Sequence, residues 1–173
     1  KIAGLKILIF DNTPSVTSSG IRYIVTSPVC SGLEKLTIRD FELTLDAYKY
    51  IASSDDLQRL DKLQFKNVNI TAKAIAEILK SKKLVALKSL SLKGNTTMDD
   101  LCATVISTYA SRLQHLATLK VDLNNEITLK GWLSVKEVRS LELNMKKVVY
   151  DQKFVEKNPE FKTREAFGKW RTT

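Results

Sequence analysis

Hydrophobic residues recur in this chain with a long and nearly constant period. In residues 33–43, apolar side chains occupy the first, fourth, sixth, ninth and eleventh positions, and the same spacing returns in residues 60–70. Further copies begin at residues 5, 87, 116 and, in degenerate form, 138. The central leucines are Leu8, Leu36, Leu63, Leu90, Leu119 and Leu141, at intervals of 28, 27, 27, 29 and 22 residues. Such a period indicates one structural unit repeated along the chain.

The centre of each copy alternates apolar and polar residues, as in Leu36-Thr37-Ile38. A period of two is typical of a short strand with one buried face. The pattern therefore predicts parallel strands near residues 7–10, 35–38, 62–65, 89–92, 118–121 and 140–143.

Between the strands the period lengthens toward that of a helix. Helices are predicted over residues 18–26, 44–53 and 71–83, and one more follows Thr97. Its predicted apolar face comprises Met98, Leu101, Cys102, Val105, Ile106 and Tyr109. Thr97 occupies the predicted N-cap position, with Asp100 as its reciprocal partner.

The repeated pattern resembles the leucine-rich repeat, L-x-x-L-x-L-x-x-N, over about residues 5–145. Its period resembles that of the longer, ribonuclease-inhibitor-like class. Asn95 and Asn124 match the asparagine of the pattern, whereas Thr13, Phe41 and Val68 replace it, so we expect irregular turns. The resemblance implies an α/β fold, a leucine-rich-repeat solenoid forming a curved horseshoe segment, with short parallel strands on its concave face and helices on its convex face.

The pattern divides the chain into a repeat array over residues 1–145 and a basic, aromatic-rich segment over residues 146–173. The second segment holds Tyr150, Phe154, Phe161, Phe167 and Trp170. It is either a cap on the last repeat or a basic arm that binds a membrane surface or a partner. No polar cap precedes the first repeat at Leu5, so we expect the chain to be part of a longer chain or a complex.

The composition contains little that suggests catalysis. Hydrophobic residues make up 43% of the 173 residues and charged residues 27%, and no apolar run approaches the roughly 18 residues of a transmembrane helix. His115 is the one histidine, and no phosphate-binding or dinucleotide-binding motif occurs. We therefore expect no enzyme activity, no catalytic or metal site and no cofactor. The pairs Asp55-Asp56 and Asp99-Asp100 are interpreted as structural residues at helix ends.

The two cysteines, Cys30 and Cys102, are too few and too far apart for a disulfide framework. We interpret them as small apolar core residues, which favours a reducing, intracellular location, either cytoplasmic or nuclear. Two glycosylation acceptor patterns, at Asn69 and Asn95, favour the opposite conclusion.

Polar side chains flank the buried leucines in the strands, and we expect them to point outward on the concave face. They are Lys35, Thr37, Arg39, Lys62, Gln64, Lys66, Ser89, Ser91, Lys93, Thr118, Lys120, Asp122, Ser140, Glu142 and Asn144. The six basic ones, Lys35, Arg39, Lys62, Lys66, Lys93 and Lys120, are the candidate partner-binding residues. Adjacent strands lie about 4.8 Å apart, so basic residues of neighbouring strands would form ladders of like charge. An acidic ligand would relieve the repulsion between these charges. The alternative is that these lysines only keep an exposed sheet soluble.

Three functions are compatible with this pattern. The first is a protein–protein interaction scaffold that binds a partner on the concave face. In the more specific version of this hypothesis, the partner is acidic. The alternative is the substrate-recruiting repeat region of a ubiquitin ligase or a microbial effector, which rests on family analogy alone. The third is a nucleic-acid-binding surface, suggested by a net charge of +9 and a pI of about 9.5. A recognised nucleic-acid-binding motif is missing, and aromatic residues do not interleave with the basic strand positions.

Overall fold

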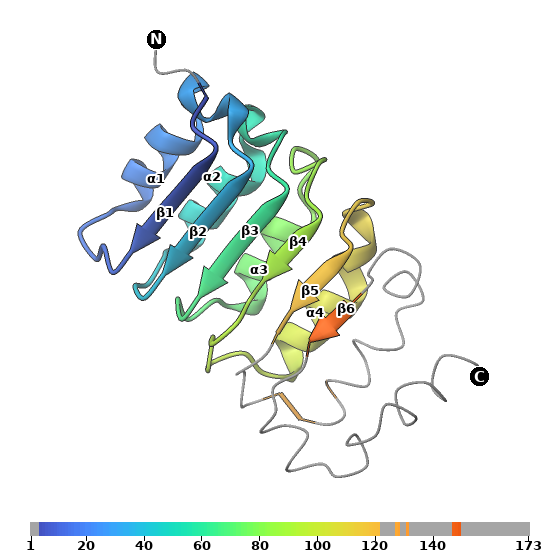
Figure 1. Ribbon diagram of the computed structural model, residues 1–173. Coiled ribbons are helices and arrows are strands. Elements are labelled where there is room, and N and C mark those ends of the chain that lie inside the picture. Colours follow the sequence, from blue (N-terminus) through green and yellow to red (C-terminus); the bar gives the residue numbers. More distant parts are fainter. Residues whose placement is uncertain (1–3, 122–126, 129–130, 132–146, 150–173) are drawn as a thin grey trace.

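The computed structural model describes residues 4–121, 127–128, 131 and 147–149, and it consists of a parallel sheet covered on one side by helices. The strands pair in chain order and in parallel (Figure 1). They are β1 (Ile7–Asp11), β2 (Lys35–Arg39), β3 (Lys62–Lys66), β4 (Ser89–Ser91), β5 (Thr118–Lys120) and β6 (Lys147–Val149).

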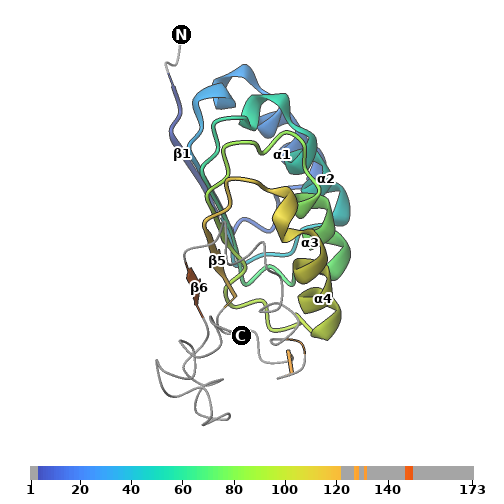
Figure 2. The ribbon, with the colours of Figure 1, turned by 90° about the vertical axis from the view of Figure 1, so that its right-hand side faces the viewer.

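One helix connects each of the first four strands to the next, and all four helices lie on the same side of the sheet (Figure 2). They are α1 (Ser18–Val25), α2 (Leu45–Ser53), α3 (Ala72–Leu79) and α4 (Asp100–Tyr109). Short 3-10 turns occur at η1 (Pro28–Gly32), η2 (Asp55–Leu57) and η3 (Ala110–Arg112). Each helix packs against its neighbours in chain order. We call one strand with its following turn and helix a unit.

The first five predicted strands and the four predicted helices are confirmed to within a few residues. The predicted strand at 140–143 lies outside the described residues, as do Asn124 and all of the predicted cap or arm over 146–173 except β6. The strand that pairs with β5 is instead Lys147–Val149, which lies beyond the predicted end of the repeat array at residue 145. Val148 aligns with Leu119, which lies 29 residues before it. The strand β6 therefore keeps the period of the earlier strands, whereas the interval from Leu119 to Leu141 is only 22 residues.

The core is built from columns of side chains that run from strand to strand. Leu36, Leu63, Leu90 and Leu119 are aligned by the strand register and have no exposed surface, as predicted. A second column begins with Phe10, Ile38 and Phe65. Because alternate residues of a strand point to opposite sides, both columns face the helices, where they bury the apolar sides of α1–α4.

Side-chain caps begin three of the helices. Thr17 accepts a hydrogen bond from the Gly20 amide, and Thr71 accepts one from the Ala74 amide. The fourth helix begins later than predicted: its N-cap is Asp99, which accepts from the Cys102 amide, rather than Thr97. The predicted apolar face is confirmed except at Leu101, which was predicted to be inward and is 61% exposed, whereas Ala103 is buried. Carboxylates are good N-caps because they accept from free amides at the positive end of the helix dipole.

The turn after each of the first four strands has a residue in the left-handed region. These residues are Asn12, Asp40, Asn67 and Gly94, with φ of 47°, 61°, 52° and 75°. Asparagine, aspartate and glycine are the residues that adopt this conformation most readily. Three of them also extend the ladder, since the amides of Asn12, Asp40 and Asn67 donate to Arg39, Lys66 and Lys93 carbonyls respectively.

Asn95 has no exposed surface and satisfies the backbone of two neighbouring units. Its Nδ2 donates to the carbonyl oxygens of Phe65 and Leu92, at 2.9 and 2.8 Å. Its Oδ1 accepts from the amides of Val68 at 2.9 Å and Ile70 at 3.4 Å. This buried amide uses both its donor and its acceptor on backbone groups of two units, which stabilises their stacking because buried backbone groups require hydrogen-bond partners.

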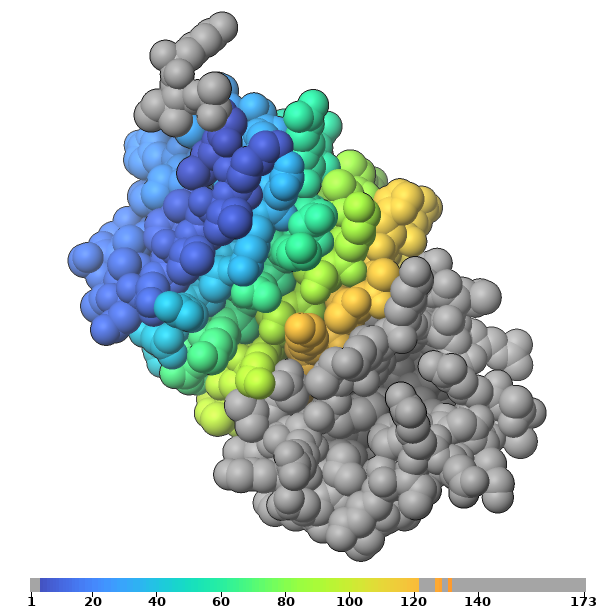
Figure 3. All heavy atoms as spheres, in the orientation of Figure 1, coloured from blue at the N-terminus to red at the C-terminus, as the bar shows by residue number. Residues whose placement is uncertain are grey.

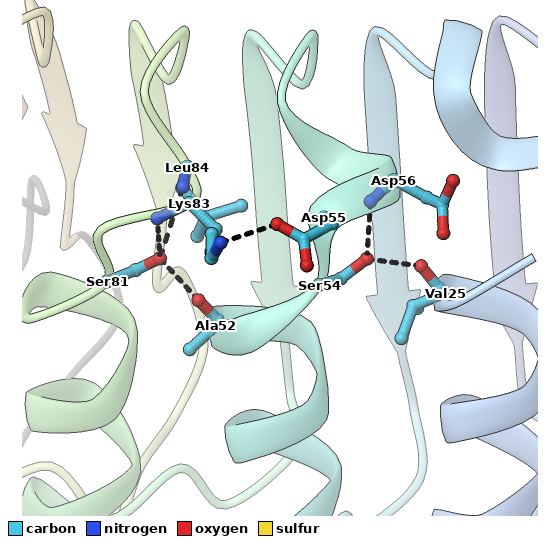
Figure 4. Close-up of polar contacts among 8 residues, drawn as sticks. All are labelled: Val25, Ala52, Ser54, Asp55, Asp56, Ser81, Lys83 and Leu84. Carbon is cyan, nitrogen blue, oxygen red and sulfur yellow. Dashed lines mark hydrogen bonds and ion pairs between the residues drawn. The ribbon is translucent and has the colours of Figure 1, made fainter. Parts of the chain in front are cut away.

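Two serines 27 residues apart join successive helices at their carboxyl ends (Figure 4). The Ser54 hydroxyl donates to the Val25 carbonyl at the end of α1, and its oxygen accepts from the Asp56 amide. The Ser81 hydroxyl donates to the Ala52 carbonyl in α2, and its oxygen accepts from the Lys83 and Leu84 amides. The last carbonyls of a helix lack partners within it, so each serine satisfies the helix of the preceding unit.

Replacing Ser54 with alanine removes this junction. We expect Ser54→Ala to lower the free energy of unfolding by about 1–3 kcal/mol, because the buried Val25 carbonyl loses its partner. Ser53→Ala is the matched control: Ser53 is exposed and donates only within its own helix, to the Lys49 carbonyl, so it should cost under about 0.5 kcal/mol. Urea unfolding of the two variants measures the difference, and equal losses would contradict this role for Ser54.

Candidate functional site

The candidate site is the side of the sheet opposite the helices, which we call the sheet face (Figure 3). It is formed by the strand residues that alternate with the buried columns, and the register aligns them in three rows. The first row is Ile7, Lys35, Lys62, Ser89 and Thr118, and the middle row is Ile9, Thr37, Gln64, Ser91 and Lys120. The third row is Asp11, Arg39 and Lys66.

Five of the six predicted partner-binding residues lie in strands of the sheet, in different rows; Lys93 follows the end of β4. Lys35 aligns with Lys62 in the first row, and Arg39 aligns with Lys66 in the third. The alignment of Lys93 with Lys66 stays a prediction, because the register of β3 with β4 ends at Ser91. Lys120 joins neither ladder, because it aligns with Ser91 in the middle row.

The middle row is more buried than the other two. Thr37 and Ser91, which we expected to project outward, are each only 6% exposed. The Thr37 hydroxyl donates to Gln64 Oε1 at 3.1 Å, and the outer rows carry the longer lysine and arginine side chains. Lys62 and Lys66 are exposed. The centre of the sheet face thus consists of the polar side chains of Thr37, Gln64 and Ser91, and the rows on either side of it carry basic groups.

The third row is not a ladder of unrelieved positive charge, because Asp11 forms an ion pair with Arg39. The hydrogen bond from Arg39, with the charges of Arg39 and Lys66, holds the pKa of Asp11 below its usual value. Asp11 in turn raises the pKa of Arg39. The sequence prediction left out the face residues of the first strand and so missed this partner. Both groups are well exposed, which limits what the pair contributes to stability.

Acidic residues also lie beside the first row. Lys6 Nζ donates to Glu34 Oε1 at 2.5 Å, between β1 and β2. This hydrogen bond, with the charges of Lys6, Arg59 and Lys62, lowers the pKa of Glu34. The start of the strands therefore carries both signs of charge. Lys62 and Lys66 are exposed and form no ion pair within the described part of the chain, although Glu34 and Asp11 lie near enough to feel their charges.

Two further residues of the sheet face were absent from the prediction. Ile7 and Ile9, on β1, are 56% and 50% exposed. They begin the first and middle rows, in register with Lys35 and Thr37. Extending the flanking positions into the first repeat of the sequence would have found them, together with Asp11.

Both cysteines, and one of the two asparagines that match the glycosylation pattern, are buried in the fold. Cys30 and Cys102 are free and buried, which confirms their predicted place in the core. Burial raises the pKa of Cys102 to about 11 and also raises that of Cys30, so neither thiol is activated as a nucleophile. Asn95 is fully buried, whereas Asn69 is exposed and donates to Glu42 Oε1 at 2.7 Å. Of the two acceptor patterns, only that of Asn69 has its amide at the surface.

Within the described ranges, no three histidine, cysteine or carboxylate side chains are grouped so as to hold a metal ion. The same ranges contain no helix of the length and apolar character needed to cross a bilayer. No known protein-family model matches the chain, and comparison with curated proteins found no significant match.

The ion pair of Asp11 can be tested through its titration. Because its pKa is lowered in the folded chain, its contribution to stability is present above its usual pKa, near 3.8, and is lost as pH falls. Arg39→Gln should return the pKa of Asp11 toward that value, as measured by NMR titration of its carboxyl carbon. Lys120→Gln, on the same face but outside the third row, should leave it unchanged. Identical titration of Asp11 in the wild type and Arg39→Gln would show that the two side chains are not paired.

Proposed function

We propose that this chain is a segment of leucine-rich-repeat solenoid of the ribonuclease-inhibitor-like class. The sequence period of 27–29 residues, the parallel sheet in chain order and the helices on one side support this assignment. Asn95 supports it further, because it occupies the asparagine position of the repeat and satisfies backbone groups of two units. In such an architecture the sheet face is the concave face, an extended surface suited to binding.

The proposed function is to bind a protein partner with an acidic surface on the concave face, as a scaffold and without catalysis. The observation that supports it best is the alignment of Lys62 with Lys35 and of Lys66 with Arg39 on adjacent strands. Strands lie about 4.8 Å apart, so these cations repel one another modestly. Carboxylates placed between them would relieve that repulsion and accelerate association. Arg39 is already paired with Asp11, so Lys62 and Lys66 are the principal anchors.

A protein partner is favoured over a nucleic acid by the acidic residues that border the rows. Asp11, Asp40 and Glu42 lie at the carboxyl end of the strands, and Glu34 lies at their start. A continuous polyphosphate chain crossing the face would meet these carboxylates, whereas a folded protein or a peptide can place its charges between them.

The test compares two double variants of equal charge. Lys62→Glu with Lys66→Glu reverses the two anchors, and Lys73→Glu with Lys82→Glu makes the same charge change on α3 and the turn that comes after it. With fluorescent polyglutamate as the probe, the first pair should weaken binding by at least about tenfold and flatten its salt dependence. The second pair should have a much smaller effect.

Three results would contradict this proposal. Equal weakening by both pairs would mean that polyglutamate responds only to net charge. No binding of polyglutamate at low salt would remove the acidic partner. Preferential binding of single- or double-stranded DNA of matched charge, abolished by the first pair, would assign the face to a nucleic acid.

A further inference from the structure

The sheet face changes character from β1 to β3. On β1 it carries Ile7 and Ile9, which are 56% and 50% exposed. The aligned positions on β2 and β3 are polar or basic, as Lys35 and Lys62 in the first row show. Exposed aliphatic side chains bordered by polar groups can anchor the apolar part of a ligand.

The charge changes in the same direction. Asp11 neutralises Arg39 at the β1 end of the third row, while Lys62 and Lys66 on β3 are exposed and form no ion pair among the described residues. Two strand spacings, about 10 Å, therefore separate an apolar, electrically balanced end from a basic end. A carboxylate would be attracted to β3 and repelled by Asp11 at β1, so the face distinguishes the two ends of a bound segment.

We propose that the partner contributes an acidic segment with aliphatic or aromatic side chains at one end. Those side chains bind on Ile7 and Ile9, and the carboxylates reach Lys62 and Lys66. In an extended segment, which advances about 3.3 Å per residue, the apolar and acidic positions are about three residues apart. This inference rests on the proposed function and adds the apolar anchor and the direction of binding. A nucleic acid has no aliphatic side chains to place on the two isoleucines.

Among the described residues β1 pairs with β2 alone, so its other edge could bind a rival occupant. The Lys35 amide donates to the Lys6 carbonyl and the Asn12 amide donates to the Arg39 carbonyl, so the even-numbered residues of β1 direct their backbone groups to β2. By the alternation of a parallel ladder, Ile7 and Ile9 direct theirs to the open edge. A second copy of the chain pairing at this edge would also cover the isoleucines, and the experiment must separate that case.

The experiment selects peptides from a displayed random library on the full chain. The selected sequences should be enriched in aspartate and glutamate, with aliphatic or aromatic residues clustered at one end of the acidic run. Ile7→Thr with Ile9→Thr keeps β-branched residues in the strand and should weaken the selected peptides by at least about tenfold. Val85→Thr with Leu101→Thr is the control, because these residues are similarly exposed, at 55% and 61%, and lie off the sheet face; it should change affinity less than about twofold.

The outcomes separate this inference from the proposed function. Acidic peptides without an apolar cluster, or peptides unaffected by the isoleucine variant, would overturn the apolar anchor and leave the acidic-partner function standing. Selected peptides without acidic enrichment, or no selected peptides, would overturn both. Sedimentation of the chain alone provides the remaining test: self-association that Ile7→Thr with Ile9→Thr abolishes would assign the isoleucines to a second copy. The composition of the selected peptides is determined on the unmodified chain, so this part of the test does not depend on whether the isoleucine variant folds.

Discussion

The structure depends on one constraint: a single strand–helix unit cannot bury its own apolar side, so each unit must stack on the next in fixed register. Leu36, Leu63 and Leu90 become fully buried only as members of a column. Stacking also buries backbone groups at the ends of strands and helices, and those groups require partners. Asn95 supplies them at a strand turn, and Ser54 and Ser81 supply them at helix ends.

The same register organises the opposite side of the sheet. Once Leu36 aligns with Leu63, Lys35 must align with Lys62 and Arg39 with Lys66. Like charges are thus brought together as a consequence of core packing, and of these four side chains Arg39 is the one that forms an ion pair with Asp11. Rows of aligned cations beside two exposed isoleucines have an energetic cost for an isolated chain. A complementary partner would remove that cost, which is the physical basis of the proposed binding.

The period of the sequence predicted the repeated elements, whereas features that depend on individual side chains were missed. Central strands and helices were placed correctly, because the leucine spacing and the helical pattern both repeat. The N-cap of α4 was predicted at Thr97 instead of Asp99, since both positions hold residues that cap helices. The sixth strand, Lys147–Val149, was missed because Val148 occupies the position at which the earlier strands carry a leucine. The burial of Thr37 and the ion pair of Asp11 with Arg39 depend on side chains in adjacent strands. The repeat pattern describes each unit separately, so it does not predict contacts between particular side chains of neighbouring units.

The central claim is our proposal that a protein partner with an acidic surface binds the sheet face at β2 and β3. The most direct measurement is NMR of the isotope-labelled chain during titration with polyglutamate. The account predicts that the largest, salt-sensitive amide shifts fall on the sheet-face strands, around Lys62 and Lys66, while those of α1–α4 change little. Largest shifts on the helices, or shifts spread evenly over all exposed lysines, would contradict it.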